Sequence, residues 1–259
     1  MCEMSKLSGY GEISREFSYA RVATLCKGLI GRGHLLDRFV VIPALNSLLG
    51  YVTEHNILDL ACGNGYLARR LAEQGALVTA IDVSSELSKL VRTKEVNEPK
   101  GITYLFSDSS DLTMIEDATF DEVVCHMALM DIENLPGTIA EVARVIQLGG
   151  RCVFSIAHPC FAVPVMQSDT SANDLPLPAT SCTYYEEGPQ LLVDSDGTQL
   201  WKFHRTLANY INAVAARGFT IRRIVEPRPS EEDIYEHPEL DAYRYCPAAL
   251  IVEAVFPYV

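Results

Sequence analysis

Residues 56–68 of this 259-residue chain read NILDLACGNGYLA, and this stretch decides the fold. Its first half is an apolar run of the kind found in a strand that is covered on both faces of a parallel sheet. Gly63 and Gly65 follow; without a Cβ they can take positive φ and let a ligand approach the main chain closely. From Tyr66 the chain begins a helix whose free N–H groups point into the turn. The stretch therefore predicts a strand, a glycine turn and a helix around an anion or polar ligand.

A second apolar run, ALVTAI at 76–81, ends at Asp82, nineteen residues after Gly63. A carboxylate in that position can accept hydrogen bonds from both hydroxyls of a ribose. The two runs together predict a site for a nucleoside cofactor. The spacing Gly63-x-Gly65-x-x-Ala68 also satisfies the loose dinucleotide motif GxGxxG/A, so a nicotinamide cofactor is an alternative at this point.

Strand-like and helix-like segments alternate from residue 56 to residue 156, as in a doubly wound α/β domain. Beyond residue 201 a further helix and two late strands are expected. The expected strands are 57–60, 76–82, 102–106, 120–125, 152–157, 219–225 and 248–256. The expected helices are 66–74, 84–96, 136–146 and 203–217, and the acidic stretch that begins at 231 is expected to be a solvated loop.

The fuller string LDLACGNG at 58–65, followed by AIDVS at 80–84, resembles motif I and the following acidic motif of the class I S-adenosylmethionine (SAM) dependent methyltransferases. In that family an acidic residue stands four positions before the first glycine of the turn, as Asp59 does here. The resemblance implies a Rossmann-like, seven-stranded mixed sheet whose last strand is antiparallel. It also implies SAM as the cofactor.

The resemblance places cofactor contacts in the two motifs and after the third and fourth strands. An acidic or polar residue after the third strand meets the adenine amino group, and Asp108 with Ser109 fits that position. The alternative role for Asp108 is to cap local N–H groups at the start of a loop. Residues after the fourth strand lie beside the methionine portion of SAM and its transferable methyl group. The expected cofactor-binding residues are Asp59, Ala61, Gly63, Gly65, Asp82, Val83, Asp108, Ser109, His126 and Met127.

Two segments, 1–55 and 158–201, lie outside the alternating pattern. Apolar residues at three- and four-residue spacing predict helices in the first, and in the family such helices often cover the cofactor. The second is longer than a simple connecting loop, and we interpret it as a lid or substrate-recognition insertion. The alternative is a surface loop whose aromatic residues pack against the body of the domain. The expected organisation is a helical cover at 1–55 and a SAM-binding domain at 56–259. Substrate contacts are expected from Tyr19, His158, Tyr184, Trp201 and His204.

Methyl transfer from SAM is an in-line displacement, so the protein must mainly align the reactants and exclude water. A hydroxyl or ammonium acceptor must also lose a proton, and histidine is the natural base near neutral pH. His158 is the first choice as catalytic base because it follows the fifth strand, and His126 and His204 are second and third. For each of the three, packing or hydrogen bonding without catalysis is the alternative.

The segments HPCF at 158–161 and FHRTLANY at 203–210 resemble a bacterial subgroup of small-molecule methyltransferases related to quinone-biosynthesis enzymes. This resemblance implies transfer to an O or N nucleophile of a small, partly apolar metabolite. A SAM-binding protein without methyl transfer (a regulator or a cyclisation catalyst) is an alternative, and a nicotinamide oxidoreductase is a weaker one.

Composition narrows the partners and the compartment. The net charge of −13 disfavours nucleic acid, because phosphate binding needs a basic surface. No run approaches the roughly 18 apolar residues that cross a bilayer, and the N-terminus lacks the pattern of a signal peptide. The eight cysteines form no CxxC pair, which is typical of the reduced cytoplasm, and no metal site is expected. The sequence predicts a cytoplasmic enzyme with a small-molecule substrate; whether it forms a homodimer is left open.

Overall fold

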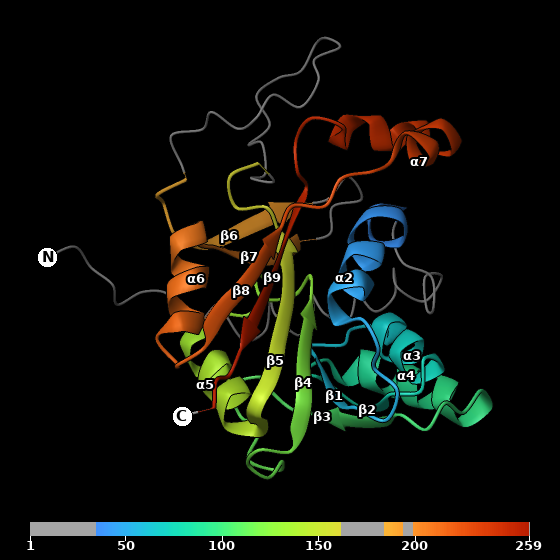
Figure 1. Cartoon of the computed structure of the whole chain (residues 1–259), viewed down its shortest axis with the longest axis vertical. Coiled ribbons are helices and arrows are strands. Elements are labelled where there is room, and N and C mark those ends of the chain that lie inside the picture. Colours follow the sequence, from blue (N-terminus) through green and yellow to red (C-terminus); the bar gives the residue numbers. More distant parts are fainter. Residues whose placement is uncertain (1–34, 162–183, 194–198, 259) are drawn as a thin grey trace, which may run out of the picture.

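The computed structural model describes residues 35–161, 184–193 and 199–258 (Figure 1). Its central sheet has seven strands: β1 (Asn56–Leu60), β2 (Leu77–Asp82), β3 (Thr103–Phe106), β4 (Phe120–His126), β5 (Ile146–Ala157), β8 (Thr220–Val225) and β9 (Ala249–Val255). Their order is β3-β2-β1-β4-β5-β9-β8. Strands β1 to β5 pair in parallel, whereas β9 is antiparallel to both of its neighbours. The predicted seven-stranded mixed α/β sheet is therefore confirmed.

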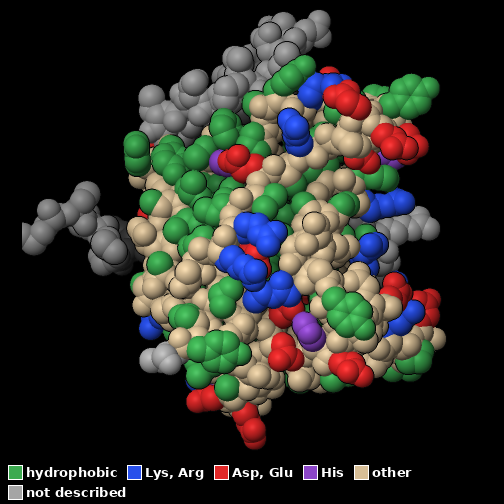
Figure 2. Space-filling model, viewed as in Figure 1, with side chains coloured by type: hydrophobic (Ala, Val, Ile, Leu, Met, Phe, Trp, Pro, Cys, Tyr) green, Lys and Arg blue, Asp and Glu red, His purple; other side chains and the backbone are tan. Residues whose placement is uncertain are grey.

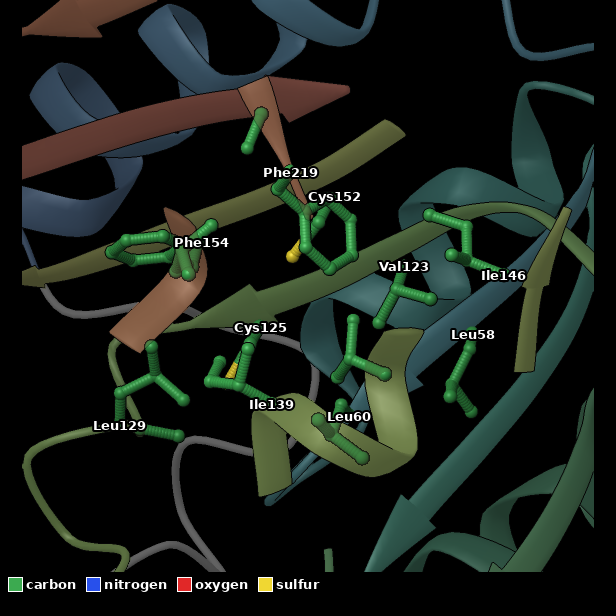
Figure 3. Close-up of a cluster of buried hydrophobic side chains, with 14 of the residues drawn as sticks. Leu58, Leu60, Val123, Cys125, Leu129, Ile139, Ile146, Cys152, Phe154 and Phe219 are labelled. Atoms are coloured by element: carbon green, nitrogen blue, oxygen red, sulfur yellow. The ribbon is translucent and has the colours of Figure 1, made fainter. Parts of the chain in front are cut away.

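Helices cover both faces of this sheet (Figure 1). On one face lie α2 (Ile42–Leu49), α3 (Tyr66–Glu73) and α4 (Ser85–Asn97), and on the other lie α5 (Leu135–Val145) and α6 (Leu207–Ala215). Side chains on a strand alternate between the two faces of the sheet. Ile57 therefore packs in the core between the sheet and α2, α3 and α4, whereas its neighbour Leu58 packs in a second core, between the sheet and α5 and α6. Figure 3 shows the second core, where Leu60, Cys125 and Ile139 meet from β1, β4 and α5.

Residues 35–49 of the N-terminal segment are helical. A π-helical turn, η1 (Asp37–Val41), runs into α2, and Pro43 occupies the first turn of α2, where its missing N–H costs nothing. Leu45 and Leu49 of α2 are buried against the sheet with Val153 of β5. Among the residues that the structure describes, none of the helices has the length and apolar character needed to span a membrane.

Two of the expected elements are wrong, and the strand expected at 152–157 begins six residues earlier, at Ile146. The helix expected at 203–217 begins only at Leu207, because the hydroxyl of Thr206 caps it by accepting from Asn209 N. Residues 203 and 204 belong instead to β7 (Gln199–His204), which pairs with β6 (Gly188–Val193) in a separate antiparallel hairpin. The acidic stretch expected to be a loop is a short helix, α7 (Glu231–Glu236), followed by a 3₁₀ helix, η2 (Pro238–Tyr243). A reciprocal capping box between Ser230 and Asp233 starts α7.

Candidate cofactor site and active site

The candidate site lies where the strand order of the sheet reverses, between β1 and β4. From β1 the chain builds β2 and β3 on one side, and from β4 it builds β5 on the other. In an open α/β sheet, ligands bind outside the carboxyl ends of the strands at this reversal. The glycine turn follows β1, and His126 is the last residue of the neighbouring strand β4. The glycine motif and His126 therefore lie at the same edge of the sheet.

Asp82 is fixed beside the glycine turn by two main-chain donors. Gly63 N donates to its Oδ2 and Ser84 N to its Oδ1, both at 2.8 Å. Each carboxylate oxygen can accept a further bond, so the group can still receive the two hydroxyls of a ribose. Gly63 has a φ of 53° and nothing lies within 4 Å of where a Cβ would stand. The turn therefore leaves open space directly beside a carboxylate that is held in place.

Gly65, two residues on, is in a different environment. Its φ is 70°, and an added Cβ would lie 2.8 Å from Tyr104 Oη and 3.2 Å from Val91 Cγ1. Tyr104 is buried and its hydroxyl has no hydrogen-bond partner among the described residues. The first glycine therefore leaves room beside the turn, while the second lets the turn pack against the protein.

We expect Gly65→Ala to destabilise the fold by about 2–4 kcal/mol, combining the cost of a left-handed alanine with that of overpacking. Gly63→Ala is the matched control: its φ is similar and its surroundings are open, so it should cost only about 1–2 kcal/mol. Urea unfolding of the two variants measures the difference. Equal losses would contradict a packing role for Gly65.

Asp59 is the buried carboxyl of the site. Its side chain is 1% exposed, Ala68 N donates to it, and its Oδ2 has no hydrogen-bond partner among the described residues. Burial, with a smaller contribution from the nearby charge of Asp82, raises the pKa of Asp59 to about 7, although the bond from Ala68 N lowers it. An acceptor that is both buried and unpaired is costly to a fold and is characteristic of a functional site.

Three carboxyl groups lie close enough to act on one another electrostatically. Asp59 interacts with Asp82, and Asp82 with Asp131, which follows β4. Burial raises the pKa of Asp82 and Asp131, and the neighbouring Lys202, which forms an ion pair with Asp131, acts in the opposite direction on Asp131. SAM carries a sulfonium and an ammonium group, so this acidic crevice with its open glycine turn fits SAM.

The residues expected around the adenine ring are at the ends of β2 and β3. Asp108 is exposed, and its Oδ1 accepts from both the N–H and the hydroxyl of Ser110 at 2.7 Å, which is the local capping role. Its second oxygen is not used in these bonds. Ser109 is buried and its hydroxyl bonds Thr138 of α5, 3.0 Å away, so it faces the protein core.

Two apolar side chains extend this surface. Val83 is 43% exposed, and Phe106, which pairs with Asp82 in the β2–β3 register, is 50% exposed. An exposed aromatic beside the ribose acceptor is suited to contact a flat base. Phe106 is not among the residues expected to bind the cofactor, and its position as the last residue of β3 was the available signal in the sequence.

His126 has one ring nitrogen that is not committed to a hydrogen bond. Its Nδ1 lies 2.8 Å from Ser155 Oγ, which also accepts from Met127 N at 3.0 Å. Its Nε2 is 3.6 Å from Asp37 Oδ1, close enough for an ion pair but too long for a good hydrogen bond. Burial lowers the pKa of His126, while the carboxylate of Asp37 raises it. The lowered pKa favours the neutral ring near pH 7, and in the tautomer whose Nδ1–H donates to Ser155 Oγ, Nε2 can take up a proton next to a carboxylate that stabilises the imidazolium.

His158 is more fully occupied. It is 3% exposed; its Nδ1 accepts from Cys160 N at 3.2 Å and its Nε2 lies 2.9 Å from Glu226 Oε1. Because Nδ1 accepts a main-chain N–H, Nε2 carries the proton that is donated to Glu226. Both nitrogens thus have partners that tie the end of β5 to the segment after β8, so the base role expected for His158 would require one of these bonds to break.

The remaining substrate candidates lie on and beside the hairpin. His204 Nε2 is 2.9 Å from Tyr184 O, and Tyr184 Oη accepts from Leu207 N at 2.9 Å. Trp201 is half-buried on β7. Tyr19 lies outside the described residues. Of the residues expected to contact the methyl acceptor, Tyr184 and His204 lie together in the structure. His158 is connected to them through Cys160, whose N–H donates to His158 and whose side chain bonds Tyr184.

Comparison with known proteins finds similarity to methyltransferases. A family model described as a methyltransferase domain matches residues 58–154. Over 123 residues the chain is 31% identical to a ubiquinone biosynthesis O-methyltransferase of Xanthomonas oryzae pv. oryzae (strain PXO99A), covering 46% of this chain and 52% of the relative. The chain therefore matches about half the length of the curated relatives.

Solved structures extend the similarity over most of the chain. An S-adenosylmethionine dependent methyltransferase from Mesorhizobium loti is 28% identical with a TM-score of 0.73, covering 87% of this chain and 99% of that one. A second, described as a putative S-adenosylmethionine dependent methyltransferase from Listeria monocytogenes, is 25% identical with a TM-score of 0.68, covering 82% and 96%. Together with the sheet order, these matches show that the chain has the fold of the class I SAM-dependent methyltransferases, with a match to a methyltransferase domain over residues 58–154, and they imply SAM as its cofactor.

Proposed function

We propose that this protein transfers the methyl group of SAM to a hydroxyl oxygen or an amine nitrogen of a small, partly apolar metabolite. The observation that carries the proposal is the carboxylate of Asp82, held by Gly63 N and Ser84 N beside an open glycine turn. The names of the curated relatives, which are O-methyltransferases of ubiquinone biosynthesis, favour a hydroxyl acceptor on a small molecule. They share only half their length with this chain, so the acceptor is part of the proposal.

The charge distribution supports a small acceptor rather than a nucleic acid. Figure 2 shows a cluster of Lys and Arg side chains over the middle of the face in view. On β5 and β8, each of three arginines (Arg151, Arg222 and Arg223) has a nitrogen within 3.6 Å of a carboxylate oxygen of the buried Glu253. These cations are engaged by the protein itself, and the whole chain carries a net charge of −13.

The proposed mechanism assigns a task to each group of residues. SAM supplies an activated methyl on its sulfonium. Asp82 would hold the ribose, Val83 and Phe106 would contact the adenine ring, and ionised Asp59 would supply negative charge that favours binding of a cationic cofactor. His126 Nε2 receives the proton that a hydroxyl acceptor loses as it attacks the methyl group, and Asp37 stabilises the resulting imidazolium. Alignment of acceptor and methyl, with exclusion of water, supplies the rest of the rate increase.

Mass spectrometry of the protein incubated with SAM and a panel of phenols, catechols and alkylamines tests the proposal. A product heavier by one methylene equivalent, formed with S-adenosylhomocysteine (SAH), is the expected result. Binding of SAM and SAH without any methylated product across the panel would favour a non-methylating role. Binding of NAD(H) in place of SAM would overturn the cofactor assignment.

We expect Asp82→Ala to weaken SAH binding about 10- to 100-fold, because hydrogen bonds to a charged acceptor contribute roughly 1.5–3 kcal/mol each and part of this is regained by water. Isothermal titration measures the dissociation constant. Asp121→Ala is the control: that carboxylate accepts from Asn56 N at the opposite ends of the strands. Unchanged SAH affinity in Asp82→Ala would remove Asp82 from the cofactor site.

A further inference from the structure

The loop between β4 and α5, residues 127–134, begins at the candidate cofactor residue Met127 and contains Asp131. It is neither helix nor strand, so its carbonyl groups need partners from elsewhere. Ala128 O accepts from Asp131 N within the loop. Four other carbonyls accept from two residues near the end of the hairpin: Leu129, Met130, Ile132 and Glu133.

Arg205 makes three of these four contacts. Its Nη1 donates to Leu129 O at 2.9 Å, and its Nη2 donates to Ile132 O at 2.6 Å and to Glu133 O at 2.7 Å. The side chain is only 9% exposed, and its guanidinium lies over the rings of Phe203 and Tyr210 at 5.7 and 5.8 Å. A buried cation is costly unless its donors are satisfied. Here the five-donor fork of arginine matches an array of main-chain oxygens that lysine could not span.

Two residues near the end of β7, just before Arg205, contact the same loop. Phe203 N donates to Met130 O at 2.7 Å, and Lys202 forms an ion pair with Asp131. The end of the hairpin, residues 202–205, is therefore bonded to the loop through both main chain and side chains. Asp131 in turn acts electrostatically on Asp82, which we assign to the ribose of SAM.

We propose that Arg205 is a positioning residue that holds the 127–134 loop in its SAM-binding conformation and so links the hairpin to the cofactor site. Without the guanidinium, three carbonyls lose their buried donors, and Met127 and Asp131 lose the support that places them beside the glycine turn. The inference rests on the proposed binding of SAM at this site, and it is independent of which acceptor is methylated.

Amide hydrogen exchange and SAH titration of Arg205→Lys test the inference. We expect exchange at residues 127–134 to become about tenfold faster without ligand, and SAH affinity to fall about 5- to 30-fold. Arg205→Met is a second variant, which keeps the side-chain volume and removes the charge; it should show the same pair of changes if Arg205→Lys does not fold. Arg244→Lys is the matched control, since Arg244 bonds the exposed side chains of Glu231 and Asp241.

The two measurements separate positioning from plain structural support. Faster loop exchange with unchanged SAH affinity would overturn the inference, because the loop would then be held for stability alone. Unchanged loop exchange would overturn it as well. If the wild-type protein does not bind SAH, both the proposed function and this inference are wrong. If the wild-type protein binds SAH and the Arg205 variants bind it equally well, only this inference is wrong.

Discussion

Replacing His126 with Asn is expected to lower kcat about 10²- to 10³-fold, the usual contribution of a general base, while SAH affinity changes by less than about threefold. The amide of asparagine can still bond Ser155 in place of Nδ1, so the end of β4 keeps its link to β5. What is lost is Nε2, the ring nitrogen that faces Asp37 and is free to take up the acceptor's proton.

The pH dependence of kcat gives this prediction a second readout. Burial lowers the pKa of His126, and a base must be neutral to act, so wild-type turnover should fall only below about pH 6.5. The acidic limb of the profile should disappear in His126→Asn, leaving a low and flat rate. Wild-type turnover in this variant would exclude His126 as the base.

His158→Asn is the comparison variant, because the sequence made His158 the first candidate for the base. Both of its ring nitrogens are bonded in the structure, so we expect this change to lower the free energy of unfolding and to leave kcat of the folded protein within about threefold of wild type. Loss of turnover in His158→Asn with normal turnover in His126→Asn would reverse the assignment.

The difference between these two histidines explains what the sequence could and could not predict. Both follow a strand at the carboxyl edge of the sheet, and that position was readable from the alternating pattern. Their hydrogen-bond partners were not readable, because Glu226 lies 68 residues from His158 and Ser155 lies 29 residues from His126. Whether a histidine is free to accept a proton depends on such distant partners.

The cofactor half of the site was more predictable because its contacts are local. Gly63, Gly65 and Asp82 belong to one β-α-β unit, whose geometry follows from the spacing of glycines and apolar runs. The structure adds the bond from Gly63 N to Asp82, which that spacing allows. By contrast, the role of Arg205 could not be predicted from the sequence, because its partners are main-chain carbonyl groups, which every residue has.

The error at 203–217 has a similar cause. Phe203 continues the apolar spacing of Leu207 and Ile211, so a helical period alone extends the helix too far. Pairing of β7 with β6 and the cap at Thr206 decide the boundary; the pairing depends on another strand, whereas the cap is a local bond to Asn209 N. The β6–β7 hairpin lies largely within the 158–201 segment, which the sequence indicated as a lid or substrate-recognition insertion without predicting its two strands.

The buried carboxyl of Asp59 predicts an unusual pH dependence of stability. Its pKa is about 7 in the folded protein, against roughly 3.9 in an unfolded chain. Between these values the folded state binds more protons than the unfolded state, so stability falls as pH rises through this range. A shift of about three units corresponds to about 4 kcal/mol, an order-of-magnitude value for a fully buried group.

Urea unfolding of wild type and Asp59→Asn at pH 4, 5.5, 7 and 8 measures this effect. We expect the variant to gain stability relative to wild type by about 4 kcal/mol on going from about pH 4 to about pH 8, since the amide has no charge to bury. Asp117→Asn, which changes a largely exposed carboxylate, should show only a small pH-dependent difference from wild type. A pH-independent difference between wild type and Asp59→Asn would show that Asp59 titrates normally.

The same carboxyl should make the binding of SAM depend on pH. The positive charges of bound SAM favour ionised Asp59, so binding lowers its pKa and releases a proton. The affinity for SAM should therefore rise with pH up to about 7 and then level off, whereas Asp59→Asn should bind SAM with weaker affinity and a flat profile. SAH lacks the sulfonium charge, so its affinity should vary less with pH. A wild-type SAM profile that is flat from pH 5.5 to pH 8 would show that the charge of Asp59 does not act on the cofactor. With the expected profile, binding of the cation offsets part of the free energy by which buried Asp59 destabilises the ligand-free protein. This gives a physical reason for an unpaired carboxyl beside the glycine turn.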